Sequence, residues 1–159
     1  MKATSDSSPL DSSPTQQSPP SEPRALLSYE PLDPTALERQ ALSASCGATT
    51  TFCGRVRDHN EGEGVTSIHY EAYEPMALKV IAEILAESDA RYPETRSVAH
   101  HRLGELQVGD AAVVVVVAAA HRAVTFEACA WIIEQLKARA PIIKHERRTS
   151  GEVWVGLGP

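Results

Sequence analysis

Two lysines near the C-terminal end of the sequence have a spacing and a setting that suit chemistry. Lys137 and Lys144 lie seven residues apart, on either side of Pro141, in a chain whose formal net charge is −6. On a helical wheel of about 100° per residue, counted from Phe126, Lys137 falls inside the apolar stripe that we predict to be buried. One interpretation is a lysine whose stem reaches water at a helix C-terminus. The other is a partly desolvated amine with a lowered pKa, able to transfer a proton or attack an electrophile.

Lys144 belongs to a segment that we predict to be a strand. Alternate residues of a strand face the same side, which puts Ile142, Lys144 and Glu146 on one face and Ile143 and His145 on the other. Because the chain turns at Pro141, Lys144 can return to the neighbourhood of Lys137. The alternative is an exposed strand lysine beside Glu146.

Two more cationic pairs occupy places that suit anions. His121 and Arg122 follow an apolar run and precede a predicted helix, where backbone N–H groups and the helix dipole favour negative charge. Arg55 and Arg57 are two residues apart and therefore share one face of their predicted strand. Each pair alone also fits solvated surface residues. Three cationic pairs in an acidic chain indicate a local site for an anionic group.

The segments that must position these residues predict an α+β fold. Apolar residues recur at helical spacing in 74–92 and 125–140, which we predict to be two amphipathic helices. A short helix is predicted for 33–44, with Asp33 as its N-cap and Pro34 at its first position. Strands are predicted for 47–57, 65–73, 96–106, 110–120, 142–148 and 152–156.

Turn signals predict that these strands pair mostly antiparallel. The loop 58–64 joins the first two strands into a predicted hairpin, and "TSG" at 149–151 joins the last two. Another antiparallel connection is expected around "QVGD", before the strand 110–120. The unbroken Val/Ala run of that strand predicts burial on both of its faces.

Composition bounds the class of protein. Residues 1–24 are dominated by Ser and Pro and are predicted to be a disordered tail, followed by one folded domain, 25–159. No pronounced basic stretch suggests a nucleic-acid partner, and the apolar run 111–120 is half the length of a membrane helix. Three cysteines without C-x-x-C spacing predict neither a disulfide framework nor a metal site. Without a secretory segment, a cytoplasmic setting is expected.

From about Gly47 to Val155 the sequence resembles a known family, the large catalytic subunits of molybdopterin synthase. Six ordered motifs carry the resemblance: "FCGRVRDHNEG", "YEAYEPMA", "HRLGEL", "VGDAAVVVVVAAAHRAVTFEAC", "LKARAPIIKHE" and "GEVWV". The resemblance implies a hammerhead-like fold and a central homodimer that becomes a heterotetramer with two small ubiquitin-like sulfur-carrier subunits. The Gly-Gly C-terminus of the carrier, as a thiocarboxylate, would deliver two sulfurs to cyclic pyranopterin monophosphate and form the dithiolene of molybdopterin. This chemistry needs no metal or other cofactor in the protein.

The resemblance also implies a set of pocket residues. They are Arg55, Val56, Arg57, His121, Arg122, Lys137, Lys144, His145 and Glu146. Both the cyclic phosphate and the thiocarboxylate are anionic, so Arg57, His121 and Arg122 are expected to hold the phosphate, and Arg55 to add positive potential. Lys137 is expected to transfer a proton or capture an intermediate. Lys144 is expected to position the carrier tail or stabilise developing charge.

Two departures from the family pattern and two alternatives remain. Ile143 stands where relatives often have Trp, and the sequence ends at Pro159, where relatives often continue with basic residues that reach the neighbouring subunit. One alternative is a non-catalytic module that binds an anionic peptide tail or a nucleotide with the same cations. The other is a structural partner without activity. A lysine on an apolar helix face favours the enzyme, because plain anion binding would favour an exposed arginine.

Overall fold

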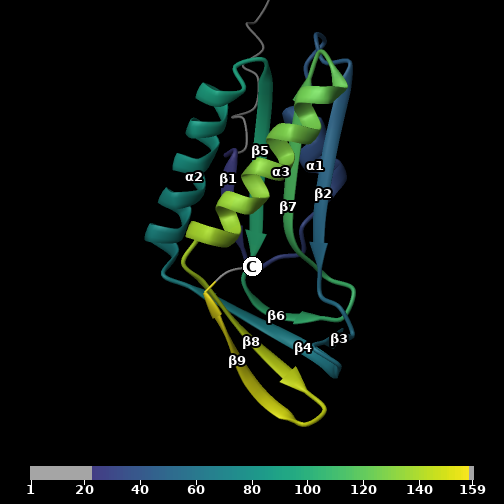
Figure 1. The fold of residues 1–159 in the computed structure, drawn as a ribbon, viewed down its shortest axis with the longest axis vertical. Coiled ribbons are helices and arrows are strands. Elements are labelled where there is room, and N and C mark those ends of the chain that lie inside the picture. Colours follow the sequence, from purple (N-terminus) through teal and green to yellow (C-terminus); the bar gives the residue numbers. More distant parts are fainter. Residues whose placement is uncertain (1–22, 158–159) are drawn as a thin grey trace, which may run out of the picture.

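Two sheets and three helices form the part of the chain that the computed structural model describes, residues 23–157 (Figure 1). The predicted α+β class is confirmed. The elements are β1 Ala25–Ser28, α1 Pro34–Ala41, β2 Ala48–Arg55, β3 His59–Asn60, β4 Glu63–Ala72, α2 Glu74–Arg91, β5 Thr95–Arg102, β6 Gly104–Gln107, β7 Ala111–Ala119, α3 Arg122–Arg139, β8 Ile142–Arg148 and β9 Gly151–Leu157.

The predicted tail falls mostly outside the described residues, except for its last two. The Arg24 guanidinium donates to both carboxylate oxygens of Asp89 at 2.9 and 3.1 Å. The Pro23 carbonyl accepts a hydrogen bond of 3.0 Å from His100 Nε2. The residues that follow form β1, a strand that the sequence analysis did not predict. The folded domain therefore includes Pro23 and Arg24.

The first sheet has the strand order β1-β5-β7-β2 and is covered on both faces. Strand β7 is antiparallel to β5 and β2, while β1 is parallel to β5. All nine residues of β7 are buried, as its unbroken Val/Ala run predicted. Helices α2 and α3 pack on one face of this sheet and α1 packs on the other (Figure 1). Helix α1 begins as predicted, because the Asp33 carboxylate accepts from the Thr35 N–H at 2.9 Å.

The second sheet is built on β4, and its pairing corrects the first predicted hairpin. Strand β4 pairs with β3, β6 and β8, whereas β2 pairs with β7 in the other sheet. The segment predicted as loop 58–64 instead contains β3 and a tight turn at Glu61 and Gly62, whose φ angles are +52° and +84°. Neighbouring strands in the sequence were assumed to pair, but the chain changes sheets after Arg55. The predicted β8–β9 hairpin is confirmed.

The segment predicted as one strand, 96–106, is two strands. Strand β5 ends at Arg102, and Gly104 at φ +84° turns the chain into β6, which pairs with β4 of the second sheet. A left-handed conformation at this position suits glycine, since a side chain there is strained. Strand β5 itself runs antiparallel to β7, as expected from the "QVGD" connection. This turn brings the second sheet against the end of the first.

His101 gives the domain a predicted dependence of stability on pH. The side chain is 2% exposed, and its ring lies edge-on to the Tyr70 ring at 5.1 Å between centroids. Burial lowers the pKa of His101 from 6.5 to about 4. The unfolded chain therefore binds a proton at this residue between about pH 6.5 and pH 4, while the folded chain does not, and stability falls as the pH falls through this window.

We expect this histidine to remove about 2 kcal/mol from the free energy of unfolding between pH 7 and pH 5. The phenylalanine variant His101→Phe keeps a ring against Tyr70 but cannot titrate. Urea unfolding of both proteins at the two pH values measures the difference. An equal loss of stability in both proteins would show that His101 does not contribute to the pH dependence.

Candidate active site

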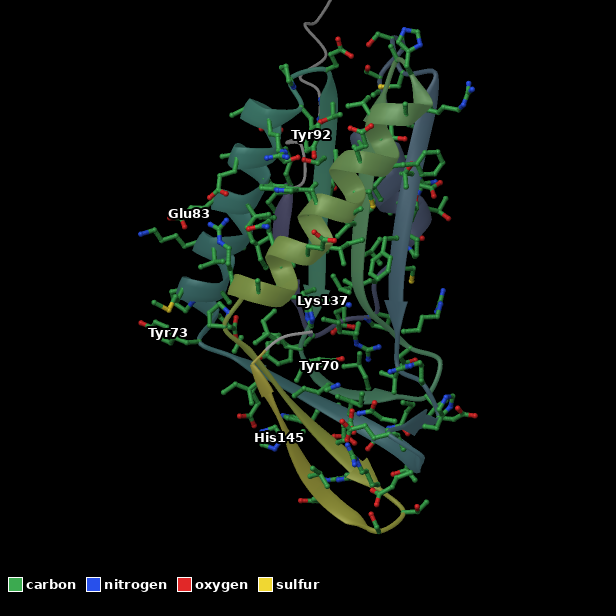
Figure 2. All side chains as sticks on the ribbon, viewed as in Figure 1. Tyr70, Tyr73, Glu83, Tyr92, Lys137 and His145 are labelled. Carbon is green, nitrogen blue, oxygen red and sulfur yellow. The ribbon has the colours of Figure 1, made fainter. Side chains whose placement is uncertain are left out.

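A cleft of about 370 Å³ opens where the two sheets meet. One wall is apolar, and the polar groups on the other walls come from five segments far apart in the sequence. Phe52, Val113, Ile133 and Leu136 form much of the apolar wall. The polar side chains are those of Arg55, Arg57, His59, Asn60, Tyr70, Lys137, Lys144 and Glu146. Figure 2 shows Lys137 at the C-terminal end of α3, beside Tyr70 of the second sheet.

Both lysines border this cleft. Lys137 comes from the last turn of α3, and Lys144 comes from β8 after the chain has turned at Pro141. The predicted division of β8 into two faces is also observed, because Lys144 and Glu146 line the cleft while His145 does not. The two amines therefore line the same cleft, as the sequence analysis suggested from the turn at Pro141.

The helical wheel, however, placed Lys137 on the wrong part of α3. The residues of this helix that are buried are Thr125, Ala128, Cys129, Ile132 and Leu136. Phe126, the reference residue of the wheel, is 62% exposed, and Lys137 is exposed as well. The buried face is made mainly of the apolar residues Ala128, Ile132 and Leu136, and Thr125 lies on it, where its hydroxyl hydrogen-bonds the Thr50 hydroxyl at 2.7 Å. The wheel placed the stripe around Phe126 and therefore on a neighbouring face of the helix.

Lys144 is held by a buried carboxylate. Its Nζ lies 3.0 Å from Oε1 of Glu146, and the Glu146 side chain is 2% exposed. Asn60 Nδ2 donates to both Glu146 oxygens, at 3.0 and 3.1 Å, and Arg148 Nε donates to Oε2 at 2.9 Å. Burial alone raises the pKa of Glu146, but the hydrogen bonds from Lys144, Asn60 and Arg148 outweigh it and hold the pKa below its usual value. Glu146 is therefore ionised near neutral pH and holds the Lys144 amine beside the cleft.

The two arginines of the "GRVR" sequence lie at the cleft, and the valine between them does not. Arg55 is the last residue of β2 and donates from Nη1 to the Gly109 carbonyl at 2.8 Å. Arg57 is exposed beyond the strand. Val56 is 3% exposed and packs in the core. Its N–H donates to the Asp110 carbonyl and its carbonyl accepts from Gly109, so Val56 anchors the chain beside the cleft.

Two of the expected pocket residues lie at the far end of α3. His121 is the N-cap and Arg122 the first residue of this helix, which begins three residues earlier than predicted, and both are exposed. Lys137 lies fifteen residues later, which corresponds to about 22 Å along a helix. Within one chain, the phosphate cluster expected from Arg57, His121 and Arg122 is therefore not assembled. The grouping of these three residues at one phosphate site therefore stays a prediction, which a single chain does not test.

His145 occupies the opposite face of β8 from Lys144. It lies across from His69 in the β4–β8 ladder, with 6.2 Å between the ring centroids. The Glu71 carboxylate is 3.9 Å from His145 Nε2 and 3.4 Å from His69 Nε2. The structure thus places His145 among carboxylates outside the cleft.

The geometry agrees with the family that matches the chain. The family model described as "MoaE protein" matches residues 27–139. The chain belongs to the MoaE family. A molybdopterin synthase catalytic subunit of Pyrococcus abyssi is 44% identical over 113 residues, which cover 71% of this chain and 76% of that protein.

Solved structures give the same assignment for this MoaE chain. The molybdopterin synthase structure from Staphylococcus aureus superimposes with a TM-score of 0.81 at 33% identity and covers 84% of this chain and 98% of that chain. A Helicobacter pylori structure, described as the protein–protein complex of subunits 1 and 2 of molybdopterin-converting factor, has a TM-score of 0.68. At 20% identity, with 82% of this chain and 89% of that chain covered, the second structure supports the fold alone.

The MoaE chain also has cleft residues that the sequence analysis missed. His59 and Asn60 reach the cleft from β3, inside a segment that was predicted to be loop. Tyr70 faces the cleft across the ladder from Lys144. Burial first, and then the negative charge of Glu146, raise the pKa of Tyr70 to about 12, so its hydroxyl keeps its proton. Ile68 and Tyr70 are two residues apart on β4, so the sequence already indicated that their side chains share one face of the strand.

Residues 23–157 contain neither a metal-binding cluster nor a membrane-spanning helix. No group of three or more His, Cys, Asp or Glu residues there could hold a metal ion. No helix in that part of the MoaE chain is long and apolar enough to cross a membrane.

Proposed function

We propose that this chain is the catalytic subunit of a molybdopterin synthase. It transfers sulfur from the C-terminal thiocarboxylate of a small ubiquitin-like carrier to cyclic pyranopterin monophosphate and so forms the dithiolene of molybdopterin. The observation that supports this most is the cleft itself, where two lysines and two arginines surround an apolar wall in a chain with a net charge of −6. Membership of the MoaE family agrees with it.

The cleft residues suit a reaction between two anions. Fixed positive groups lower the energy of bringing a phosphate and a thiocarboxylate together. Arg57, at the rim, is placed to bind the phosphate in a bidentate manner, and Arg55 adds positive potential. Lys137, next to the cleft but accessible, is our candidate for proton transfer or transient covalent capture. Lys144, fixed by Glu146, orients the carrier tail or stabilises the charge that develops. The proposal requires no metal or cofactor of the protein.

The position of His121 and Arg122 leads us to propose that the site is shared between two copies of the chain. Phe126, Ala130 and Ile133 form an apolar stripe on α3 that one chain leaves exposed or half-buried and that leads to the cleft. A two-fold axis across this stripe would pack two α3 helices antiparallel and cover it. The N-terminus of one helix would then lie beside the C-terminus of the other. His121 and Arg122 of the partner subunit would thereby join Lys137.

The partner proposed from the resemblance is a small sulfur carrier with a Gly-Gly C-terminus, bound to each half of the homodimer to give a heterotetramer. A cleft lined by cations fits an extended, flexible tail that ends in an anion. All three cysteines are free thiols, which fits a location in the reducing cytoplasm.

A direct assay tests the proposed function. The purified chain is incubated with thiocarboxylated carrier and the cyclic pterin, and the dithiolene product is measured after its conversion to a fluorescent derivative. Product should form only when all three components are present. Because Lys137 is not buried, its position no longer favours an enzyme over a non-catalytic module that binds an anionic tail. Tight binding of the carrier without product would support that module.

Arg57→Ala should weaken binding of the pterin. The substitution removes a charge-assisted contact to phosphate worth roughly 1.5 to 3 kcal/mol, which corresponds to a KM increase of about 10-fold to 150-fold. Arg57 is exposed, so the thermal stability should be unchanged. Steady-state kinetics at saturating carrier measure the effect. An unchanged KM for the pterin would remove Arg57 from the phosphate site.

A further inference from the structure

We propose that Asn60 is a positioning residue for Lys144 and acts through Glu146. This inference rests on the proposed function, because it assumes that Lys144 works on a ligand in the cleft. It extends the site to β3, the short strand that the sequence analysis assigned to a loop.

Three side chains hold the Glu146 carboxylate. Two cations approach it from its own strand: Lys144 bonds Oε1 at 3.0 Å and Arg148 bonds Oε2 at 2.9 Å. Both have long side chains with many rotamers, and they alone would leave the plane of the carboxylate free to turn. The amide nitrogen of Asn60 contacts both oxygens, at 3.0 and 3.1 Å, from a different strand. Those two contacts fix the plane.

The strand that carries Asn60 is itself held in place. Asn60 pairs with Glu63 across the two-residue turn, as the last pair of the β3–β4 ladder. Arg148 reaches over this turn, with Nη2 3.3 Å from a Glu61 oxygen and Nη1 3.3 Å from a Glu63 oxygen. Ser150 Oγ donates to the same Glu63 oxygen at 2.9 Å. The turn is thus tied to β8 and to the β8–β9 turn, and the short Asn60 side chain cannot move far from Glu146.

The Asn60 amide is uncharged. An asparagine amide holds a carboxylate without adding a positive charge, so the negative charge of Glu146 remains available to the Lys144 ammonium. A lysine or arginine in its place would compete with Lys144 for Glu146. The Glu146 side chain is 2% exposed, so water has little access to replace a lost hydrogen bond. Asn60 therefore sets the position of the amine with little effect on the charge of the cleft.

The test compares Asn60→Ala with the wild-type chain in two readouts. In the synthase assay, kcat should fall by about tenfold or more, while the KM for the pterin stays within about twofold. In the second readout, an amine-reactive acylating reagent labels the lysines, and peptide mass spectrometry follows Lys144 relative to Lys79, whose side chain is 75% exposed. We expect labelling of Lys144 to become at least about threefold faster in the variant. Without the hydrogen bonds from Asn60, the Glu146 carboxylate can turn and holds the Lys144 amine less firmly.

Two further variants serve as controls for this test. Thr66→Ala removes an exposed hydrogen bond from β4 to the Arg147 carbonyl without touching Glu146 or the turn, and it should behave like the wild type in both readouts. Asn60→Gln restores an amide donor and should recover part of the lost turnover. Unchanged Lys144 labelling and turnover in Asn60→Ala would overturn the proposal, as would an equal loss in Thr66→Ala.

If the wild-type chain made no dithiolene product, the proposed function would fail. The labelling experiment would still decide whether Asn60 positions Lys144, because it requires neither the pterin nor the carrier.

Discussion

Replacing Lys137 by alanine should reduce dithiolene formation by about 100-fold or more, the usual contribution of a group that moves a proton in the transition state. The loss should appear in kcat at saturating carrier and pterin. Lys137 is exposed, so the variant should fold, keep its melting temperature and bind its carrier. Single-turnover assays with preloaded carrier measure the chemical step directly.

Lys137→Arg separates charge from chemistry. Arginine keeps the positive field at the end of α3 but does not lose its proton near neutral pH. We expect the arginine variant to be almost as inactive as the alanine variant. Full activity with arginine would reduce Lys137 to an electrostatic role, and full activity with alanine would exclude it from the mechanism. Lys79→Ala, on an exposed face of α2, is the matched control and should be fully active.

Mixing two inactive variants should restore activity if the site is shared between subunits. At a pterin concentration far below the KM of the Arg122→Ala variant, Arg122→Ala and Lys137→Ala should each be nearly inactive as homodimers. In a mixed dimer, one site receives the intact Lys137 of one chain and the intact Arg122 of the other, while the second site carries both substitutions. Random assembly makes half of the dimers mixed, so co-expression should recover about a quarter of the wild-type activity.

The control for this experiment is a pair of substitutions at two residues that the same chain contributes to the site. Arg57→Ala and Lys137→Ala remove groups that lie at the same cleft of one chain, so no mixed dimer of these two has an intact site. That mixture should recover nothing beyond the residual activity of its parents. Failure of Arg122→Ala and Lys137→Ala to complement each other, with mixed dimers demonstrated by mass spectrometry, would show that the site lies within one chain.

Several parts of the molecule were predictable because they depend on local sequence. The nine buried residues of β7 followed from a Val/Ala run without polar interruption. The start of α1 followed from Asp33 and Pro34, and the return of Lys144 to Lys137 followed from the proline between their elements. Capping, strand alternation and turn chemistry act over a few residues, so the sequence alone determines them.

Only the tertiary structure decided which strands meet and which side of α3 is buried. β2 and β4 are consecutive among the predicted strands yet belong to different sheets, because pairing energy comes from partners far away in the sequence. Ala128, Ile132 and Leu136 of α3 face the core together with Thr125, whose hydroxyl bonds that of Thr50 in β2. Phe126 and Lys137 are left exposed. Asn60 reaches Glu146 through a two-residue turn that the predicted loop hid. The residue types at the site were therefore determined by the sequence, while their grouping was decided by contacts between segments up to about ninety residues apart, whose energies no local pattern contains.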